Sequence, residues 1–337
     1  MRSTAIFSLS ILVAASSSPA SAWGGAGHEL VSRAGAQALP PALPDFVRSA
    51  TAIDEITALG PELDRSKDAG RSHDLDRDPG HYTDIGDDGK IAGTVDPAAL
   101  PVSREAYDTA LRGAGTDQYK MGFLPYAIVD GWEQVAKDFA IWRVDRAGER
   151  RAADAGDRAW FAADRALRES LTLRDIGVWS HYVGDGSQPL HVSVHYNGWG
   201  NFPNPNGYTL STKTHAAFES TFVRAHARLD GIVAHMRPLA PSAEPIAQLV
   251  GAYLEASASH VVPLYELEKQ GAFEKGTAPA VDFVDARLAD GAAELRDLIV
   301  DAWNASATVK VGYPNAITPS DAEGGTVPVR SGVDPAD

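Results

Sequence analysis

The sequence contains no cysteine, no strongly basic stretch and, beyond its first residues, no long apolar run. Without cysteine the chain forms no disulfides, so any bound metal must be held by nitrogen and oxygen ligands. Lys and Arg number 30 against 45 Asp and Glu, a net charge of −15 that argues against a nonspecific electrostatic grip on duplex DNA. An acidic protein can still act on phosphodiesters if metal ions supply the local positive charge.

Alternating strand patterns are also scarce, and no segment after the N-terminal region is long enough to form a transmembrane helix. Amphipathic helical patterns dominate, so we expect a mainly α protein: a single-domain multi-helix bundle over residues 23–310, followed by a flexible tail at 311–337. No transmembrane anchor and no obligate protein partner is evident. The expected helices cover Gly27 to Ala38, Arg104 to Arg112, Tyr119 to Arg146, Ala153 to Glu169, Leu171 to Asp185, His215 to Met236, Ile246 to Lys269 and Val281 to Ala305.

The first 22 residues have the features of a secretion signal. A basic start at Arg2 precedes an apolar run at 5–15 that is too short to span a bilayer, and Ala22 ends a small-residue cleavage site. We therefore expect residues 1–22 to be removed and the protein to be secreted or periplasmic. Cleavage makes Trp23 the new N-terminus, whose α-amino group titrates near pH ~8 and can bind a metal when neutral.

Two histidine and carboxylate pairs have a spacing that suits metal binding. His181 and Asp185 lie four residues apart, as do His215 and Glu219, so each pair shares one helix face. His191 follows the first pair after a proline, which should end the helix and place this imidazole nearby. Each pair alone is a weak signal, but the set predicts a cluster of metal sites.

Further candidate ligands lie near the predicted mature N-terminus and in an acidic loop. The amino and carbonyl groups of Trp23 can form a chelate, which His28, five residues on, can join. The loop from Gly60 to Asp88 adds Asp64 and His81. Imidazole and carboxylate groups of this kind suit zinc.

Taken together, these residues resemble the superfamily of zinc-dependent phospholipases C and single-strand-specific zinc nucleases. The resemblance extends from Trp23 to at least Glu219 and is specific as a set. The matching residues are Trp23, His28, Asp64, His81, His181, Asp185, His191, His215 and Glu219.

The resemblance implies three Zn²⁺ ions at the base of a cleft in a mainly helical bundle. Two of the ions would lie close together, bridged by Asp185. The first would have as ligands Asp64, His81, His181 and Asp185. The second would be held by the amino and carbonyl groups of Trp23, by His28 and by a neighbouring residue of the third site. The remaining ion would have as ligands His191, His215 and Glu219.

The resemblance also implies roles in catalysis and substrate binding. The close pair of zinc ions would turn a shared water into hydroxide, which attacks the phosphorus. Asp64 could orient or deprotonate that water, and Lys67 lies where a basic residue clamps the phosphate. Tyr82 and Asp84 match an aromatic residue and an acid that stack on and hydrogen-bond a base.

Three functions remain open at this point. The first is a single-strand-preferring endonuclease that releases 5′-phosphorylated products from DNA and RNA, with possible 3′-nucleotidase activity. The second is a phospholipase C acting on phosphatidylcholine-type head groups, a branch in which the last ligand is a glutamate such as Glu219. The third is a non-catalytic, metal-stabilised binding protein. The nuclease is favoured because the opening at Trp23, the basic Lys67 and the pair Tyr82 and Asp84 resemble that branch.

The loop from Val192 to Thr214 is rich in aromatic residues whose role the sequence leaves open. Its side chains could stack on a second nucleotide, touch a lipid surface or pack the loop onto the bundle. These aromatic residues are Tyr196, Trp199, Phe202 and Tyr208.

Overall fold

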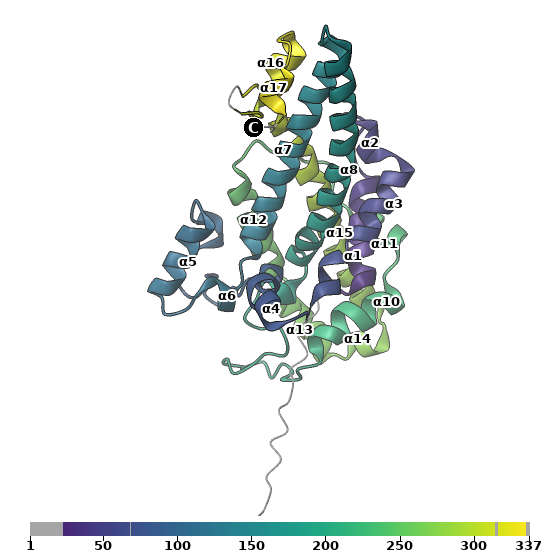
Figure 1. The fold of residues 1–337 in the computed structure, drawn as a ribbon. Coiled ribbons are helices and arrows are strands. Elements are labelled where there is room, and N and C mark those ends of the chain that lie inside the picture. Colours follow the sequence, from purple (N-terminus) through teal and green to yellow (C-terminus); the bar gives the residue numbers. More distant parts are fainter. Residues whose placement is uncertain (1–22, 68, 314–315, 335–337) are drawn as a thin grey trace, which may run out of the picture.

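A computed structural model describes residues 23–67, 69–313 and 316–334 of the chain (Figure 1). The predicted signal peptide lies outside the described residues. Within them the regular secondary structure is helical, and β structure is limited to isolated bridges. The expected mainly α fold class is therefore confirmed.

Helices of very different length make up the fold. The longer helices are α1 (Gly25–Gln37), α3 (Ala50–Leu59), α5 (Arg104–Gly113), α7 (Leu124–Arg151), α8 (Ala155–Gly186), α12 (Ile246–Ala258) and α15 (Ala278–Ala305). The shorter α-helices are α2 (Asp45–Arg48), α4 (Arg71–Arg77), α6 (Gln118–Met121), α9 (Thr214–Ala216), α10 (Val223–His226), α11 (Leu229–His235), α13 (Val261–Lys269), α14 (Ala272–Lys275), α16 (Pro319–Gly324) and α17 (Arg330–Val333). Short turns of other helix types are η1 (Glu62–Ser66), η2 (Asp78–His81), η3 (Pro97–Ala99), η4 (Pro189–His191), η6 (Ser306–Thr308) and the π-helical η5 (Ala217–Phe222).

Helices α7 and α8 form the longest pair and run side by side along the molecule (Figure 1). Pro125 stands in the first turn of α7, where its missing N–H leaves no hydrogen bond unmade. Asp154 caps α8 by accepting from the first backbone N–H groups of that helix. The helices approach closely at Gly131, where a Cβ would lie 2.0 Å from the ring of Trp179.

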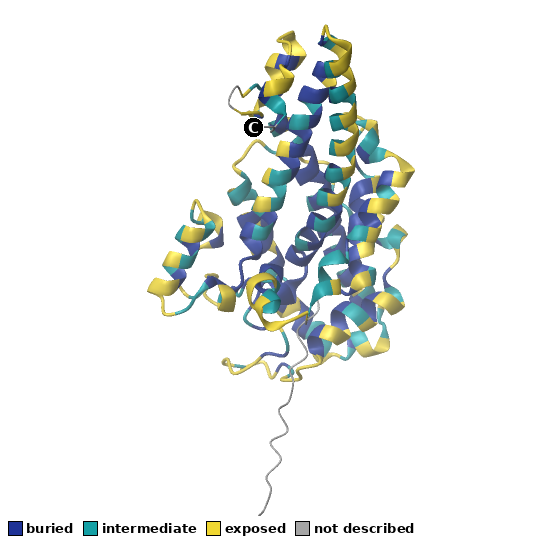
Figure 2. Cartoon of the chain, in the orientation of Figure 1, coloured by how far each residue is buried: buried dark blue, intermediate teal, exposed yellow. Residues whose placement is uncertain are grey.

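Helices α1, α3 and α15 pack on α8 and close the core around its C-terminal half. Two glycines permit these contacts: a Cβ on Gly177 would lie 2.6 Å from that of Leu59, and one on Gly35 would lie 2.9 Å from the carbonyl oxygen of Ala292. Figure 2 shows buried residues concentrated along the facing sides of the long helices. Core side chains between these helices include Val31, Ile56, Ile176, Val183 and Leu295.

The structure joins two of the expected helices into one and divides three others. The helix expected at 215–236 is divided among α9, η5, α10 and α11, and the helix expected at 246–269 is divided between α12 and α13. The segments expected at 153–169 and 171–185 form the single helix α8, because no glycine or proline separates them. The helix expected from 119 to 146 is instead divided between α6 and α7 at Gly122. Gly122 has a φ of 78°, and a Cβ there would lie 2.0 Å from the carbonyl oxygen of Tyr82. The glycine thus brings the segment that follows His81 against the start of α7.

The C-terminal segment 316–334, for which the sequence predicts a loose tail, contains α16 and α17. Helix α16 packs on α7 with Ala322 fully buried. Arg151 donates hydrogen bonds to the carbonyl oxygens of Ala322 and Glu323, and Arg143 pairs with the Glu323 carboxylate at 3.1 Å. These contacts attach the described part of the segment to the bundle.

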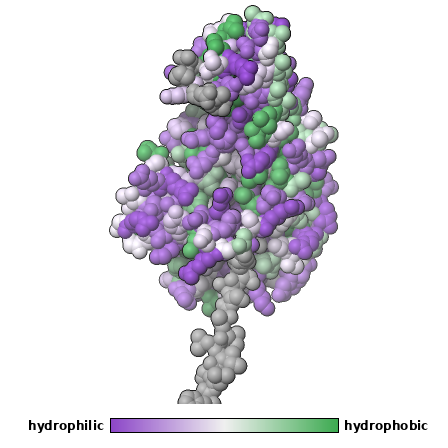
Figure 3. Space-filling view, in the orientation of Figure 1, coloured by the Kyte–Doolittle hydropathy of each residue, from purple (hydrophilic) through white to green (hydrophobic). Residues whose placement is uncertain are grey.

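Among the residues that the structure describes, none of the helices combines the length and apolar character needed to cross a membrane. The face of the molecule drawn in Figure 3 is mostly hydrophilic, with apolar side chains scattered between polar ones.

Candidate metal centre

Three groups of side chains that could hold metal ions gather around the end of α8. The central group is His28, His181 and Asp185. The loop group is Asp64, His81 and His181. The outer group is His191, His215 and Glu219. All are buried except Asp64, which is partly exposed.

Different elements contribute these ligands. His181 and Asp185 lie one turn apart on the last turns of α8, while His28 comes from α1. Helix α8 then ends at Gly186, and Pro189 begins the turn η4 that presents His191. The expected helix end before His191 is confirmed.

His215 and Glu219 share a short helical segment that changes its pitch. His215 lies in α9, and Glu219 lies in η5, where the chain makes a π-helical turn. Such turns occur often at functional sites, because the extra residue redirects a side chain. The His215 Nε2 and Glu219 Oε2 atoms lie 2.7 Å apart, so the four-residue spacing brings this pair together as expected.

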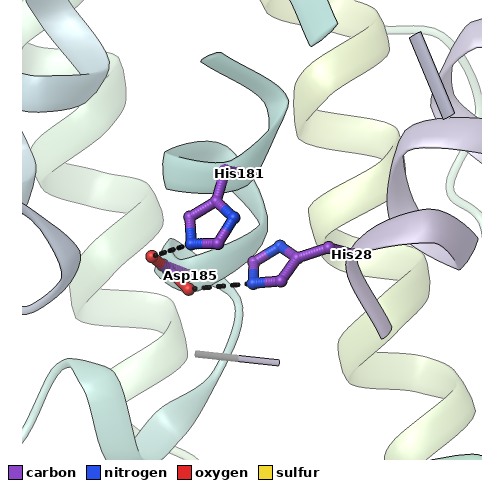
Figure 4. A group of neighbouring side chains, drawn as sticks. All are labelled: His28, His181 and Asp185. Atoms are coloured by element: carbon purple, nitrogen blue, oxygen red, sulfur yellow. Dashed lines mark ion pairs between the residues drawn. The ribbon is translucent and has the colours of Figure 1, made fainter. Parts of the chain in front are cut away.

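The carboxylate of Asp185 faces both His28 and His181 in the central group (Figure 4). Its Oδ1 lies 3.5 Å from His28 Nε2, and its Oδ2 lies 3.5 Å from His181 Nε2. Oδ2 also lies 3.1 Å from Nδ1 of His81. One carboxylate thus directs its two oxygens at imidazoles of two different groups, which is the arrangement that a bridging ligand requires.

Backbone carbonyl groups orient three of the imidazoles. In each ring Nδ1 faces a carbonyl oxygen at hydrogen-bond distance, so Nδ1 carries the proton and the lone pair is left on Nε2. The pairs are His181 with Gly60 at 2.8 Å, His191 with His81 at 2.6 Å, and His215 with Tyr196 at 2.7 Å.

The distances between donor atoms suit a shared metal ion. Two ligand atoms about 2.1 Å from one tetrahedral ion lie about 3.4 Å apart. In the loop group, His181 Nε2 is 3.0 Å from His81 Nδ1 and 3.6 Å from Asp64 Oδ1. In the outer group, His191 Nε2 is 3.1 Å from His215 Nε2 and 3.6 Å from Glu219 Oε2.

Buried polar atoms without hydrogen-bond partners in the described structure also support metal binding at these groups. Both ring nitrogens of His28 are in this state, as are one oxygen each of Asp185 and Glu219. An unpartnered polar group in a protein interior is costly, and a bound cation would satisfy all of these oxygens and the imidazole. The residues present therefore fit metal ions.

Burial sets the protonation of the groups. It lowers the pKa of His28 and His81 well below the ordinary value, and that of His181 to about 4. The imidazoles are therefore neutral near pH 7, which is the form that binds a metal. Burial also raises the pKa of Asp185 well above its usual range, so ionisation of this carboxyl group is favoured by a neighbouring cation.

Lys67 lies at the edge of the loop group. Its Nζ atom is 2.5 Å from Asp64 Oδ1, and its side chain is only 9% exposed. After burial and the neighbouring His181, the charge of Lys67 is among the causes that lower the pKa of His28 and His81. The structure thus places an ammonium group beside the candidate ligands.

The two predicted base-binding residues follow His81 directly. Tyr82 is partly buried, and its hydroxyl donates to the carbonyl oxygen of Tyr119 at 3.2 Å. Asp84 is also partly buried, and burial raises the pKa of its carboxyl group to about 7. Contact of either residue with a base stays a prediction.

A cavity of about 350 Å³ lies beside the loop group. Tyr182 lines this cavity, and its ring centre is 5.4 Å from that of His81. The wall also contains the cationic side chains of Arg77 and Arg104 and the ring of Phe123. It therefore offers both positive charge and aromatic surface next to the candidate metal ligands, although Asp76, Asp130 and Asp175 also line it.

Trp23 is fully buried next to the outer group. Its indole Nε1 donates to Ser187 Oγ at 2.9 Å, and its ring centre lies 5.4 Å from that of Phe218. A Cβ on Gly24 would lie 2.5 Å from the Oγ of Ser220. The start of the predicted mature chain thus packs against the residues on either side of Glu219, whereas metal binding by its amine stays a prediction.

The aromatic residues of the loop 192–214 separate into two kinds. Trp199 and Tyr208 are 6% and 3% exposed and pack against each other, which assigns them to the interior of the loop. Tyr196 and Phe202 are 50% and 41% exposed. His195 fixes this loop, because its two ring nitrogens bond the carbonyl oxygen of Trp199 and the carboxylate of a neighbouring loop aspartate.

Gln188 is a buried neighbour of the ligands that the sequence did not single out. Its side-chain amide lies 3.2 Å from both Glu219 Oε2 and His215 Nε2. Its position in the sequence could have identified it, because it lies between the candidate ligands Asp185 and His191.

No protein-family model matches this chain, and no curated protein is significantly similar to it in sequence. Membership of a family is therefore not shown. The activity has to be inferred from the side chains that meet at the end of α8 and from the spacing of the motifs.

Proposed function

We propose that this chain is an exported, zinc-dependent phosphodiesterase, and specifically an endonuclease that prefers single strands. It would cleave DNA and RNA to 5′-phosphorylated products and also remove the phosphate of 3′-nucleotides. Each of the three groups would hold one zinc ion, with the N-terminal amine of Trp23 completing the central group. The observation that supports this best is Asp185, whose Oδ1 faces His28 of the central group and whose Oδ2 faces His81 of the loop group.

The bound ions would lower the pKa of a shared water and offset the negative charge of a phosphodiester. Asp64 is partly exposed, so its carboxylate can orient a water at the edge of the loop group or accept a proton from it. The ammonium of Lys67, 2.5 Å from this carboxylate, can bind a phosphate oxygen. Both residues then act at the position where substrate meets the metals.

Tyr82, Asp84 and the neighbouring cavity support a nucleic-acid substrate. Stacking of a base on an aromatic ring contributes roughly 1–3 kcal/mol and tolerates different bases. Asp84 offers a carboxylate to base N–H groups. Arg77 and Arg104 in the cavity wall could pair with a phosphate, although three aspartates line the same wall.

A second candidate is a phospholipase C for phosphatidylcholine-type lipids. Glu219 favours it, because the resemblance associates a glutamate at the last ligand position with that branch. The exposed Tyr196 and Phe202 are also compatible with contact at a lipid surface.

Parallel assays on single-stranded DNA, RNA, a 3′-mononucleotide and phosphatidylcholine test the proposal. We expect acid-soluble 5′-nucleotides, loss of turnover on adding a chelator, and recovery with zinc. His191→Ala should abolish turnover, whereas the matched substitution His260→Ala, at a histidine outside the three groups, should retain it.

Release of phosphocholine without nucleotide products would replace the nuclease by the second candidate. Absence of turnover on every phosphodiester, in a protein that still binds zinc, would leave a binding protein whose metals are structural.

A further inference from the structure

Gln188 is fully buried in the turn between α8 and η4 and contacts four residues that carry candidate ligands, Asp185, His191, His215 and Glu219. Its backbone N–H donates to the carbonyl oxygen of Asp185 at 3.0 Å, and its own carbonyl accepts from the N–H of His191 at 2.9 Å. The backbone of one residue thus links a ligand of the central group to a ligand of the outer group.

The side chain of Gln188 has one orientation that satisfies its neighbours. Oε1 accepts from the backbone N–H of Leu190 at 2.6 Å, and because that N–H is only a donor, the facing atom must be the amide oxygen. The NH₂ group therefore points the other way. It lies 3.2 Å from Glu219 Oε2 and 3.2 Å from His215 Nε2.

The oxygen that Gln188 contacts is the one that faces the other ligands of the outer group. Glu219 Oε2 is 2.7 Å from His215 Nε2 and 3.6 Å from His191 Nε2. A carboxylate oxygen has two lone pairs, so it can bind a cation with one and accept an N–H with the other. A neutral amide in this place orients the carboxylate without cancelling its charge, as a lysine or an arginine would.

We propose that Gln188 is a positioning residue for the outer group: it holds Glu219 in the geometry that binds a metal. Glutamate has a flexible side chain, and fixing it in one rotamer has an entropic cost that a preformed hydrogen bond reduces. Partners of this kind typically change metal affinity by roughly 10- to 100-fold. The inference rests on the metal loading in the proposed function, but not on the identity of the substrate.

Gln188→Met tests this, because methionine has nearly the same length and shape but no N–H. The matched control is Gln118→Met, at a mostly buried glutamine outside the three groups. Each protein is loaded with zinc, and zinc per chain is measured during competition with graded chelator. We expect one of the wild-type zinc ions to bind about 10- to 100-fold more weakly in Gln188→Met. The other ions, and all ions in the control, should be unchanged.

Gln188→Asn provides a second variant, because its side chain keeps the amide but is one methylene shorter, which moves the NH₂ group away from Glu219. It should weaken the same single ion. Raising free zinc should restore activity to both Gln188 variants with kcat close to that of the wild type.

Equal weakening of all ions, or no weakening of any, would overturn the positioning role. Wild-type protein that binds no zinc would instead refute the proposed function itself. Wild-type protein that binds zinc but cleaves no phosphodiester would leave the role of Gln188 standing.

Discussion

At the scale of single residues, Asp185 combines full burial with contacts to several candidate ligands. It is fully buried, burial raises its pKa well above the usual range, and imidazoles face both of its oxygens. An amide has the same shape but one oxygen fewer and no charge, so it cannot bridge two cations.

We therefore expect Asp185→Asn to disturb the central and loop groups together. Zinc content should fall by more than one ion per chain, and turnover should fall by about 10²- to 10³-fold, as when a group that stabilises charge in the transition state is lost. Metal analysis and kinetics on the purified variant would measure both. Asp138→Asn, at another fully buried aspartate, is the control and should keep its metals. A variant that retained both ions and near-normal turnover would contradict the bridging role.

The identities of the candidate ligands were predictable from the sequence because imidazole and carboxylate side chains recur at four-residue spacing. The spacing alone brings His181 to Asp185 and His215 to Glu219. The hydrogen bonds that orient the rings were not predictable. Their acceptors are backbone carbonyl groups, such as that of Gly60. Because every residue has such a group, residue types do not reveal which one accepts.

At the scale of elements, α7 and α8 enclose buried acids as well as apolar side chains. Asp145 on α7 is fully buried beside Asp164. Burial, and then the charge of Asp164, raise the pKa of Asp145 to about 8. The proton on this carboxyl group therefore contributes to the stability of the helix pair.

The sign of the resulting pH dependence follows from the two protonation states. Between about pH 4 and pH 8 the unfolded chain has lost this proton while the folded chain keeps it, so stability falls as the pH rises through this window. Asp145→Asn should flatten the fall and raise stability at pH 8 relative to the wild type, by at most about 1.4 kcal/mol per unit of pKa difference. Urea unfolding at pH 5 and pH 8 measures this.

Asp54→Asn is a suitable comparison, because the Asp54 side chain is 68% exposed. Its pH profile should match that of the wild type. An Asp145→Asn protein with an equally steep fall would show that the carboxyl group titrates normally.

The ends of helices could be predicted from the sequence only where a local signal, such as a proline, determines them. Pro189 opens the turn before His191 as predicted, whereas the division of the 119–146 segment at Gly122 depends on contact with the remote Tyr82. The π-helical turn around Glu219 was also not predictable, because a helical pattern of apolar residues does not distinguish one extra residue in a turn.

At the scale of the whole molecule, the packing of Trp23 ties the predicted mature N-terminus to the outer group. Its ring is fully buried against Phe218, and its indole N–H bonds Ser187. An amine at this residue has little freedom to move away from the neighbouring ligands.

Adding one methionine before Trp23 in the mature protein should therefore lower zinc content and activity, because it removes the free amine from the chelate. We expect activity to fall by at least about tenfold, the lower end of the effects seen when groups around a metal are disturbed. One residue added after Asp337 should have no such effect. Equal zinc content and turnover in both extended proteins would exclude the amine as a ligand.

The mainly helical fold was predictable because apolar periodicity is repeated along the chain and strand patterns are scarce. The attachment of residues 316–334 was not, because it depends on long-range contacts. Arg151 reaches the carbonyl oxygens of α16 from the far end of α7, and a segment rich in Gly and Pro gives no local sign of such a partner.

The candidate ligands span the chain from His28 to Glu219, and they meet at one place in the fold. Ions held there would crosslink segments that are distant in the sequence and that no covalent bond joins. Disulfide bonds have this role in many exported proteins. If the proposed zinc ions bind there, removal of zinc should loosen the packing between these segments and make the chain more susceptible to proteolysis, and added zinc should protect it.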